Sequence, residues 1–187
     1  MSEHQEYFEY LKKRSFLGFI YRQYFLYPKI SNYLQGKTLD IGCGIGDFLS
    51  YRNNTIGVDI NKETVNWCRD KGLEAFIMNE DKIPFEDNTF DSVIMDNVLE
   101  HISEPKPLME EIIRVMKKNG KLMIGVPGEV GYSVDDDHKV FYTRESLKKL
   151  LGEYEFKEEV FFETPSKFKA FKRMRQHCLY STFSLKN

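Results

Sequence analysis

The sequence predicts an α/β fold built on a doubly wound, mostly parallel sheet. Three observations indicate it: short apolar runs alternate with helical patterns after residue 36, a glycine cluster follows the first run, and acidic residues stand at strand ends. Alternating strands and helices favour parallel pairing through crossover helices. The length of 187 residues is about that of one domain with its own core.

Five apolar runs are short enough to be buried strands. They cover residues 38–41, 55–59, 75–78, 90–95 and 122–126. Two further β-leaning segments, residues 157–163 and 178–185, lie near the end of the sequence. These segments together predict the strands of a single sheet.

Helical spacing of apolar residues predicts helices between the strands. Residues 62–71 form one of them, and residues 107–118 form another that Asn119-Gly120 is expected to stop. Thr143 is expected to cap a further helix that continues to Leu151, because its hydroxyl can accept a hydrogen bond from the first turn.

The amino-terminal part predicts a helical cap over residues 1–35, followed by the main domain over residues 36–187. The cap contains two or more helical segments, with a break near Ser15 and Gly18, and Pro28 ends or restarts the last of them. A stripe at helical spacing, formed by Phe16, Phe19, Ile20, Tyr24 and Tyr27, is expected to pack in the core.

The composition is that of a soluble globular protein, with 41% hydrophobic and 30% charged residues. Cys43, Cys68 and Cys178 are scattered and form no Cys-x-x-Cys pair, which argues against a disulfide scaffold or a zinc ribbon. No run is long enough to span a membrane, and the first residues lack the pattern of a signal peptide. We therefore expect a cytoplasmic location.

Charge is distributed unevenly along the chain. Residues 164–187 contain six basic residues and no acidic one, although the whole chain has a net charge of −2. This basic carboxy-terminal segment forms either a solvated face or a contact with an anionic partner. Such a partner is a phosphorylated substrate, a membrane surface at its periphery or, least expected, a nucleic acid.

The glycine cluster Gly42-Cys43-Gly44-Ile45-Gly46 directly follows the first strand. Glycines at this position let the backbone turn tightly and let a ligand approach it closely. A dinucleotide site favours the spacing GxGxxG, whereas here the spacing is GxGxG and Asp40 precedes it. A carboxylate at this position repels a diphosphate and suits a positively charged ligand. Asp59, at the end of the second strand, is placed to bind the hydroxyls of a ribose.

Four ordered segments carry a family resemblance: residues 39–46, 83–91, 96–102 and 118–122. Their sequences Leu-Asp-Ile-Gly-Cys-Gly-Ile-Gly, Ile-Pro-Phe-Glu-Asp-Asn-Thr-Phe-Asp, Asp-Asn-Val-Leu-Glu-His-Ile and Lys-Asn-Gly-Lys-Leu resemble motifs of the class I S-adenosylmethionine (SAM)-dependent methyltransferases. The resemblance covers roughly residues 36–152 and is greatest to small-molecule enzymes of methyltransferase type 11, which are related to ubiquinone-pathway enzymes. It implies a Rossmann-like methyltransferase fold, with a mostly parallel seven-stranded sheet and helices on both faces.

The resemblance also implies the cofactor SAM and a set of binding residues. The methionine end would lie on the glycine loop, the ribose on Asp59, and the sulfonium above the residues that follow the fourth strand. The family has an aspartate for the adenine amino group where this chain has Asn79-Glu80, so that assignment is weaker. The implied cofactor-binding residues are Asp40, Gly42, Cys43, Gly44, Gly46, Asp59, Ile60, Asn61, Asn79, Glu80, Asp96 and Asn97.

Methyl transfer to an oxygen or a nitrogen requires removal of the acceptor's proton. Of the four histidines, His138 is the candidate base, because it follows Asp135-Asp136-Asp137 in the loop after the fifth strand. Neighbouring carboxylates raise the basicity of a histidine. A solvated acidic loop with an incidental histidine is the alternative. A metal site made from the same residues lacks a defined ligand spacing, so none is expected.

The segment from Asp135 to Tyr142 resembles loops of methyltransferases from surface-carbohydrate or nucleotide-sugar pathways. We therefore expect a small-molecule acceptor, namely an oxygen of a sugar- or phosphate-bearing metabolite. Three alternatives remain: an NAD(P)-dependent oxidoreductase, a non-catalytic methyltransferase-like partner subunit, and a nucleic-acid methyltransferase. The last is disfavoured because Met95-Asp96-Asn97-Val98 replaces the Pro-Pro-aromatic pocket that holds a flipped base. The sequence leaves the oligomeric state open.

Overall fold

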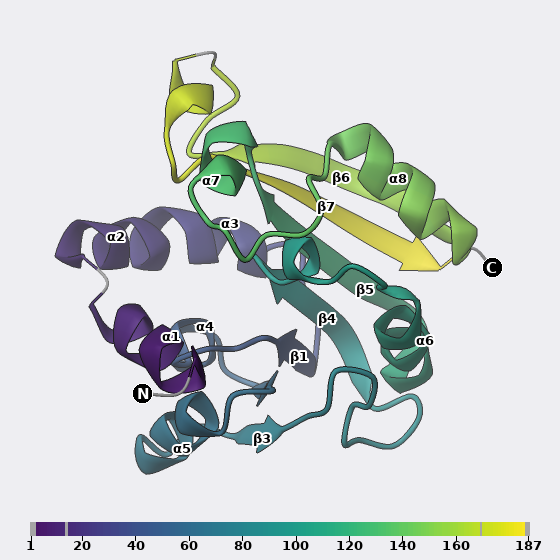
Figure 1. Cartoon of the computed structure of the whole chain (residues 1–187). Coiled ribbons are helices and arrows are strands. Elements are labelled where there is room, and N and C mark those ends of the chain that lie inside the picture. The colour runs from purple at the N-terminus through teal and green to yellow at the C-terminus, as the bar shows by residue number, and fades with distance from the viewer. Residues whose placement is uncertain (1–2, 14, 169, 186–187) are drawn as a thin grey trace.

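The computed structural model describes residues 3–13, 15–168 and 170–185, which fold around one seven-stranded sheet (Figure 1). The strand order is β3-β2-β1-β4-β5-β7-β6. The strands are β1 Thr38–Ile41, β2 Thr55–Asp59, β3 Ala75–Ile77, β4 Phe90–Asp96, β5 Met116–Pro127, β6 Phe156–Thr164 and β7 Cys178–Leu185. Strands β1 to β5 pair in parallel, and β7 runs antiparallel to both β5 and β6. The predicted mostly parallel sheet is confirmed.

Helices cover both faces of this sheet. They are α1 Glu3–Lys12, α2 Phe16–Tyr21, the π-helix η1 Arg22–Leu26, α3 Tyr27–Ser31, α4 Asp47–Tyr51, α5 Lys62–Asp70, the 3₁₀ helix η2 Leu99–His101, α6 Lys106–Val115, α7 Glu129–Ser133, α8 Arg144–Glu153 and the 3₁₀ helix η3 Phe171–Arg173. Side chains alternate between the faces along a strand. In β4, Val93 and Met95 therefore pack with α6 and α8, whereas Ile94 packs with α3 and α4.

Most predicted boundaries agree with the structure, and one helix end was wrong. Thr143 caps α8 through a capping box, as its position predicts. Helix α6, however, ends at Val115 rather than at Asn119-Gly120, and β5 begins at once with the buried Met116. Met116 pairs with Phe90, and the register then shifts. Asn119 adopts a left-handed φ of +65° in this irregularity, a conformation that asparagine tolerates.

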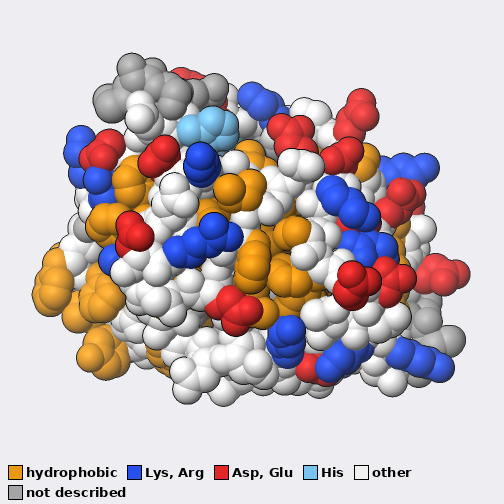
Figure 2. Space-filling model, turned by 90° about the horizontal axis from the view of Figure 1, so that it is seen from below, with side chains coloured by type: hydrophobic (Ala, Val, Ile, Leu, Met, Phe, Trp, Pro, Cys, Tyr) orange, Lys and Arg blue, Asp and Glu red, His pale blue; other side chains and the backbone are white. Residues whose placement is uncertain are grey.

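The ring stripe in the amino-terminal part is mostly exposed, so its expected burial was wrong. Ser15 caps α2, which confirms the break there, but Gly18 lies inside that helix. Phe16 is 74% exposed and Tyr24 69%, whereas Tyr27 is buried at 4%. The reason is that α2 projects past the edge of the sheet domain (Figure 1). Figure 2 shows hydrophobic side chains gathered at the left edge of the view, where α1 and α2 lie.

The end of the predicted cap belongs to the core of the domain. Leu26, Tyr27 and Ile30 pack in one cluster with Ile94 and Met123 of the sheet. A boundary at residue 35 is visible in the sequence, but packing joins α3 to the sheet. Within the described part of the chain, no helix is both long and apolar enough to cross a membrane.

A buried ion pair fixes the segment that follows β3. Both carboxylate oxygens of Glu111 accept hydrogen bonds from Arg114, at 2.7 Å each, and one of them also accepts from the backbone N–H of Ile83 at 2.9 Å. Arg114 also donates to the carbonyls of Ile83 and Phe85. The hydrogen bonds from Arg114, helped by those from Ile83 and Lys82, lower the pKa of Glu111 to about 2.

We expect Glu111→Gln to lower the free energy of unfolding by about 1.5–3 kcal/mol near neutral pH, the usual contribution of hydrogen bonds to a charged group. Because the pKa of Glu111 is lower in the folded state, its stabilisation is present above about pH 4.5 and is lost as the pH falls toward 2. Urea unfolding of both proteins across this pH range measures the effect. Glu110→Gln on the same helix is the control, because that side chain is 61% exposed. Equal losses in the two variants would contradict the prediction.

Candidate active site

The glycine loop follows β1 and turns sharply toward α4. Gly42, Gly44 and Gly46 have φ values of +72°, +53° and +78°, a region that side-chain-bearing residues rarely adopt. The backbone N–H of Gly44 donates to a carboxylate oxygen of Asp59 at 2.8 Å. The backbone N–H groups of Gly42 and Cys43 also donate to the Val58 carbonyl, at 2.8 and 3.1 Å, so several hydrogen bonds join the loop to the end of β2. Cys43 is buried in the loop, with its Sγ facing Gly57.

Asp59 and Asn61 hold the loop and the neighbouring helix in place. The second carboxylate oxygen of Asp59 accepts from the backbone N–H of Asn61 at 2.8 Å, and the residue is only 6% exposed. Burial raises the pKa of Asp59, while these two backbone hydrogen bonds lower it. The Asn61 side chain caps α5 through Glu63 and donates to the carbonyl of His4 at 2.8 Å. Asn61 therefore ties α1 to the site.

Two carboxylates lie near the carboxyl ends of the adjacent strands β1 and β4: Asp40, which is buried, and Asp96, which is half-buried. With Gly42, Tyr27 and Phe48, among others, they line a cavity of about 60 Å³. Burial raises the pKa of Asp40 well above its ordinary value, and the carboxylates of Asp96 and Asp59 raise it further. A cation placed among these groups stabilises their charged forms. The strand order reverses at this point, where ligands bind in doubly wound sheets.

An open cleft of about 500 Å³ lies beside the residues that follow β2 and β3. It brings together three of the predicted residues: Ile60, which is 50% exposed, Asn79 and Glu80. The other lining residues are His4, Met78 and Asp81. The small cavity therefore lies near the carboxyl ends of β1 and β4, and the open cleft lies near those of β2 and β3.

Tyr180 of β7 belongs to this site, although the sequence did not point to it. Its hydroxyl donates to Asp96 Oδ1 at 2.7 Å, and the Asn97 side-chain amide donates to the same atom at 3.0 Å. Tyr180 is 1% exposed, and its ring lies where a side chain at Gly125 would stand. The only signal in the sequence was a ring within a β-leaning segment, which does not distinguish a site residue from a core residue.

His138 lies in a buried group rather than in an acidic solvated loop. The structure places its Nε2 3.8 Å from Glu100 Oε1 and 3.9 Å from Asp135 Oδ2, and its side chain is 7% exposed. Its Nδ1 is 2.8 Å from the carbonyl of Tyr132, on whose ring it stacks. The His101 ring lies 4.7 Å away between centroids. The nearest carboxylate is thus that of Glu100, which the sequence did not single out.

The loop after α7 is fastened to η2 at Glu100. The backbone N–H groups of Lys139 and Val140 donate to the Glu100 carbonyl at 2.7 and 3.0 Å. Figure 1 shows the green segment after α7 passing beside this short helix. Burial raises the pKa of the Glu100 side chain to about 8, and burial lowers the pKa of His101.

Helix α1 lies against the glycine loop and also contacts the basic segment that precedes β7. Leu11 of α1 is buried at 2%, and a side chain at Gly44 would lie 3.3 Å from it. Arg175 donates to the Tyr10 hydroxyl at 3.0 Å, so the basic segment contacts α1. His177 lies apart from His138 and pairs with Glu163 at 3.0 Å. The predicted cofactor site is therefore bordered by α1.

The fold, the glycine loop and the carboxylates at the ends of β1, β2 and β4 define a class I SAM-dependent methyltransferase domain. Comparison with known proteins agrees: residues 39–124 match the family described as "Methyltransferase domain" (Methyltransf_11). This part of the chain is therefore similar to methyltransferase type 11 domains, and the cofactor of the class is SAM. The predicted class and cofactor are confirmed, and an NAD(P)-dependent oxidoreductase is not favoured.

Curated relatives match only part of the chain. An uncharacterized protein from Methanocaldococcus jannaschii is 39% identical over 92 residues, which are 49% of this chain and 45% of that protein. A tRNA (carboxymethyluridine(34)-5-O)-methyltransferase from Xenopus tropicalis is 33% identical over 110 residues, which are 54% of this chain and 18% of that enzyme. The chain thus spans less than half the length of either relative.

Solved structures share the fold over the whole chain. The structure of a SAM-dependent methyltransferase from Thermotoga maritima superposes with a TM-score of 0.79, covers 100% of both chains and is 20% identical. At this identity the likeness shows the fold and leaves the acceptor open.

Proposed function

We propose that this protein transfers the methyl group of SAM to an oxygen of a small, sugar- or phosphate-bearing acceptor. The observation that carries the proposal is His138, held beside Glu100 in the loop after α7. With Nδ1 protonated and donating to Tyr132, Nε2 presents a lone pair that has no hydrogen-bond partner among the described residues. An oxygen nucleophile needs its proton removed, and such a nitrogen is suited to that task.

Each cofactor-binding residue has a distinct role in this proposal. Asp59 accepts hydrogen bonds from the ribose hydroxyls, and the cleft with Ile60, Asn79 and Glu80 receives the adenine. Asp40 and Asp96 face the charged methionine end. In the reaction the acceptor oxygen attacks the methyl carbon in line, the carbon–sulfur bond breaks, and the acceptor's proton leaves to the protein. Alignment of the oxygen, carbon and sulfur and exclusion of water supply much of the rate.

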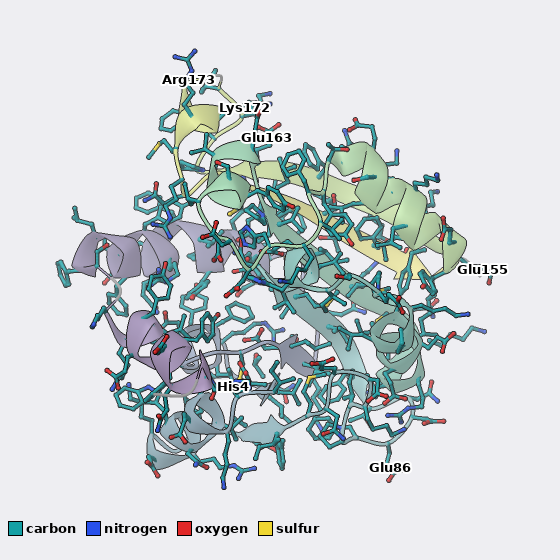
Figure 3. The ribbon with its side chains drawn as sticks, viewed as in Figure 1. His4, Glu86, Glu155, Glu163, Lys172 and Arg173 are labelled. Carbon is teal, nitrogen blue, oxygen red and sulfur yellow. The ribbon has the colours of Figure 1, made fainter. Side chains whose placement is uncertain are left out.

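An anionic acceptor is supported by the basic carboxy-terminal segment, residues 164–187. Its η3 helix contacts α7, and the carbonyl of Arg175 lies against Gly131 of α7. Lys172 pairs with Glu163 at 3.1 Å, and Figure 3 shows Arg173 pointing away from the molecule. Part of the basic charge is therefore neutralised within the protein, and Arg175 is the base nearest to α7 and α1.

A tRNA oxygen is the second candidate acceptor, because the Xenopus relative acts on carboxymethyluridine in tRNA by its name. The net charge of −2 disfavours it, since nucleic-acid binding depends on a broad basic surface.

We expect the purified protein to transfer a labelled methyl group from SAM to acceptors within a panel of sugar phosphates and nucleotide sugars, but not to total tRNA. Mass spectrometry of the product should place the methyl group on oxygen. If only tRNA became labelled, the acceptor would be a tRNA oxygen and not a small molecule. Label on nitrogen, or no SAM binding by calorimetry, would overturn the proposal.

A further inference from the structure

Glu100, His101 and His138 form a cluster in which one ligand atom of each lies within 4.8 Å of the others. The cluster joins η2 to the loop after α7, which two backbone hydrogen bonds hold at Glu100. Sequence analysis predicted no metal site, and the set that it considered was His138 with the aspartates before it. We propose that the cluster binds one divalent transition-metal ion.

Glu100 provides the main argument for a missing ligand. The residue is 0% exposed, and neither carboxylate oxygen has a hydrogen-bond partner among the described residues. Such a buried carboxyl group is stable as the neutral acid, whereas its charged form needs a cation or hydrogen-bond donors beside it. Its Oε1 lies 3.8 Å from His138 Nε2, so the carboxylate and the imidazole converge on one point.

His138 is oriented as a metal ligand. Its Nδ1 lies 2.8 Å from the Tyr132 carbonyl, which fixes the tautomer with the proton on Nδ1 and the lone pair on Nε2. Metal-binding histidines usually donate their other ring N–H to a carbonyl or a carboxylate in this way. Because the acceptor is a backbone carbonyl, this hydrogen bond does not depend on the side chains of the loop.

The ligand atoms of the cluster can bind one ion if they move slightly closer together. Two ligands bound at about 2.0–2.2 Å to one ion lie about 3–3.5 Å apart, so the observed separations need to shorten by about 1 Å. Two imidazoles and one carboxylate favour Zn²⁺, Mn²⁺ or Fe²⁺ over Mg²⁺ or Ca²⁺, which prefer oxygen ligands. Three protein ligands leave open positions on the ion.

The location gives the ion a role, and this part of the inference rests on the proposed function, with His138 acting as a ligand instead of the base. Glu100 and His101 lie in η2, which begins three positions after Asp96, the residue at the predicted sulfonium position. An ion in the cluster therefore lies in the segment that directly follows that position. An acceptor hydroxyl bound at an open position loses its proton more readily, since the metal stabilises the alkoxide. Asp135, 3.9 Å from His138, is placed to receive that proton directly or through water.

Metal binding is measured on the chelator-treated, full-length protein by calorimetry with Mn²⁺ and Zn²⁺ and by thermal unfolding. Mn²⁺ is included because it binds thiolates weakly, which keeps Cys43 and Cys68 out of the result. We expect one ion per chain and a rise in melting temperature. Glu100→Gln and His138→Gln should each weaken binding about 100-fold or more, beyond the 10–100-fold that loss of an outer partner costs.

Two controls separate a metal site from a structural role. Asp136→Asn removes an exposed carboxylate of the same loop, and His4→Gln removes a histidine elsewhere, so both should bind metal like the wild type. Without metal, Glu100→Gln should melt no lower than the wild type, because it replaces an unpartnered carboxylate by a neutral group. No uptake by the wild type, or equal uptake by Glu100→Gln, would overturn the metal site. Failure to bind SAM with metal uptake intact would instead count against the proposed function.

Discussion

His138→Ala is expected to lower turnover by about 10²–10⁴-fold while leaving SAM affinity nearly unchanged. The expected loss is the usual contribution of a group that removes the acceptor's proton. His138 is buried beside Glu100 and is hydrogen-bonded to Tyr132, whereas the glycine loop and Asp59 lie on other elements. Single-turnover rates with labelled SAM measure the chemical step, and calorimetry measures cofactor binding.

The matched control is Asp136→Asn, which alters an exposed acid of the same loop and should leave turnover within about threefold of the wild type, under roughly 1 kcal/mol in barrier height. A His138→Ala rate within that same limit would remove His138 from the chemistry. Chelator treatment separates two ways in which His138 can act. If it works as a metal ligand, chelation should slow the wild type but not the variant; if it works as a base, chelation should affect neither.

Asp59→Ala is expected to weaken SAM binding by about 1.5–3 kcal/mol, which is about 10- to 150-fold in dissociation constant. The variant loses the carboxylate that we propose binds the ribose, and also the hydrogen bonds that this carboxylate accepts from the backbone of Gly44 and Asn61. Calorimetric titration with SAM measures the change.

Asp59→Asn separates the loss of the ribose contact from the loss of the loop hydrogen bonds. Its amide oxygen remains as one acceptor, for the loop or for the ribose. It should therefore bind SAM with an affinity between those of Asp59→Ala and the wild type. Unchanged affinity in Asp59→Ala would remove Asp59 from the cofactor site and weaken the assignment of the neighbouring residues.

The sequence determined the fold class and the cofactor, because short buried strands and the glycine loop leave local patterns in the sequence. Strands such as Thr38–Ile41 and Thr55–Asp59 are buried on both faces, so they appear as short apolar runs. The loop requires positive φ angles, which glycine adopts readily, so the glycines in the sequence indicate the loop. Parallel strands end at one edge of the sheet, so Asp40, Asp59 and Asp96 were expected together before the structure placed them there.

Only the tertiary structure decided which side chains from distant segments meet. Glu100 and His138 are 38 positions apart, and they converge because the loop after α7 is fastened to η2 by backbone hydrogen bonds that any residue type can make. Tyr180 reaches Asp96 from a strand 84 positions later for the same reason. The exposure of the α2 rings could not be predicted from the sequence either. Helical spacing shows that a helix has an apolar face, but it does not show whether the rest of the domain extends far enough to bury that face. Local periodicity encodes elements, whereas the contacts between them depend on the packing of the whole chain.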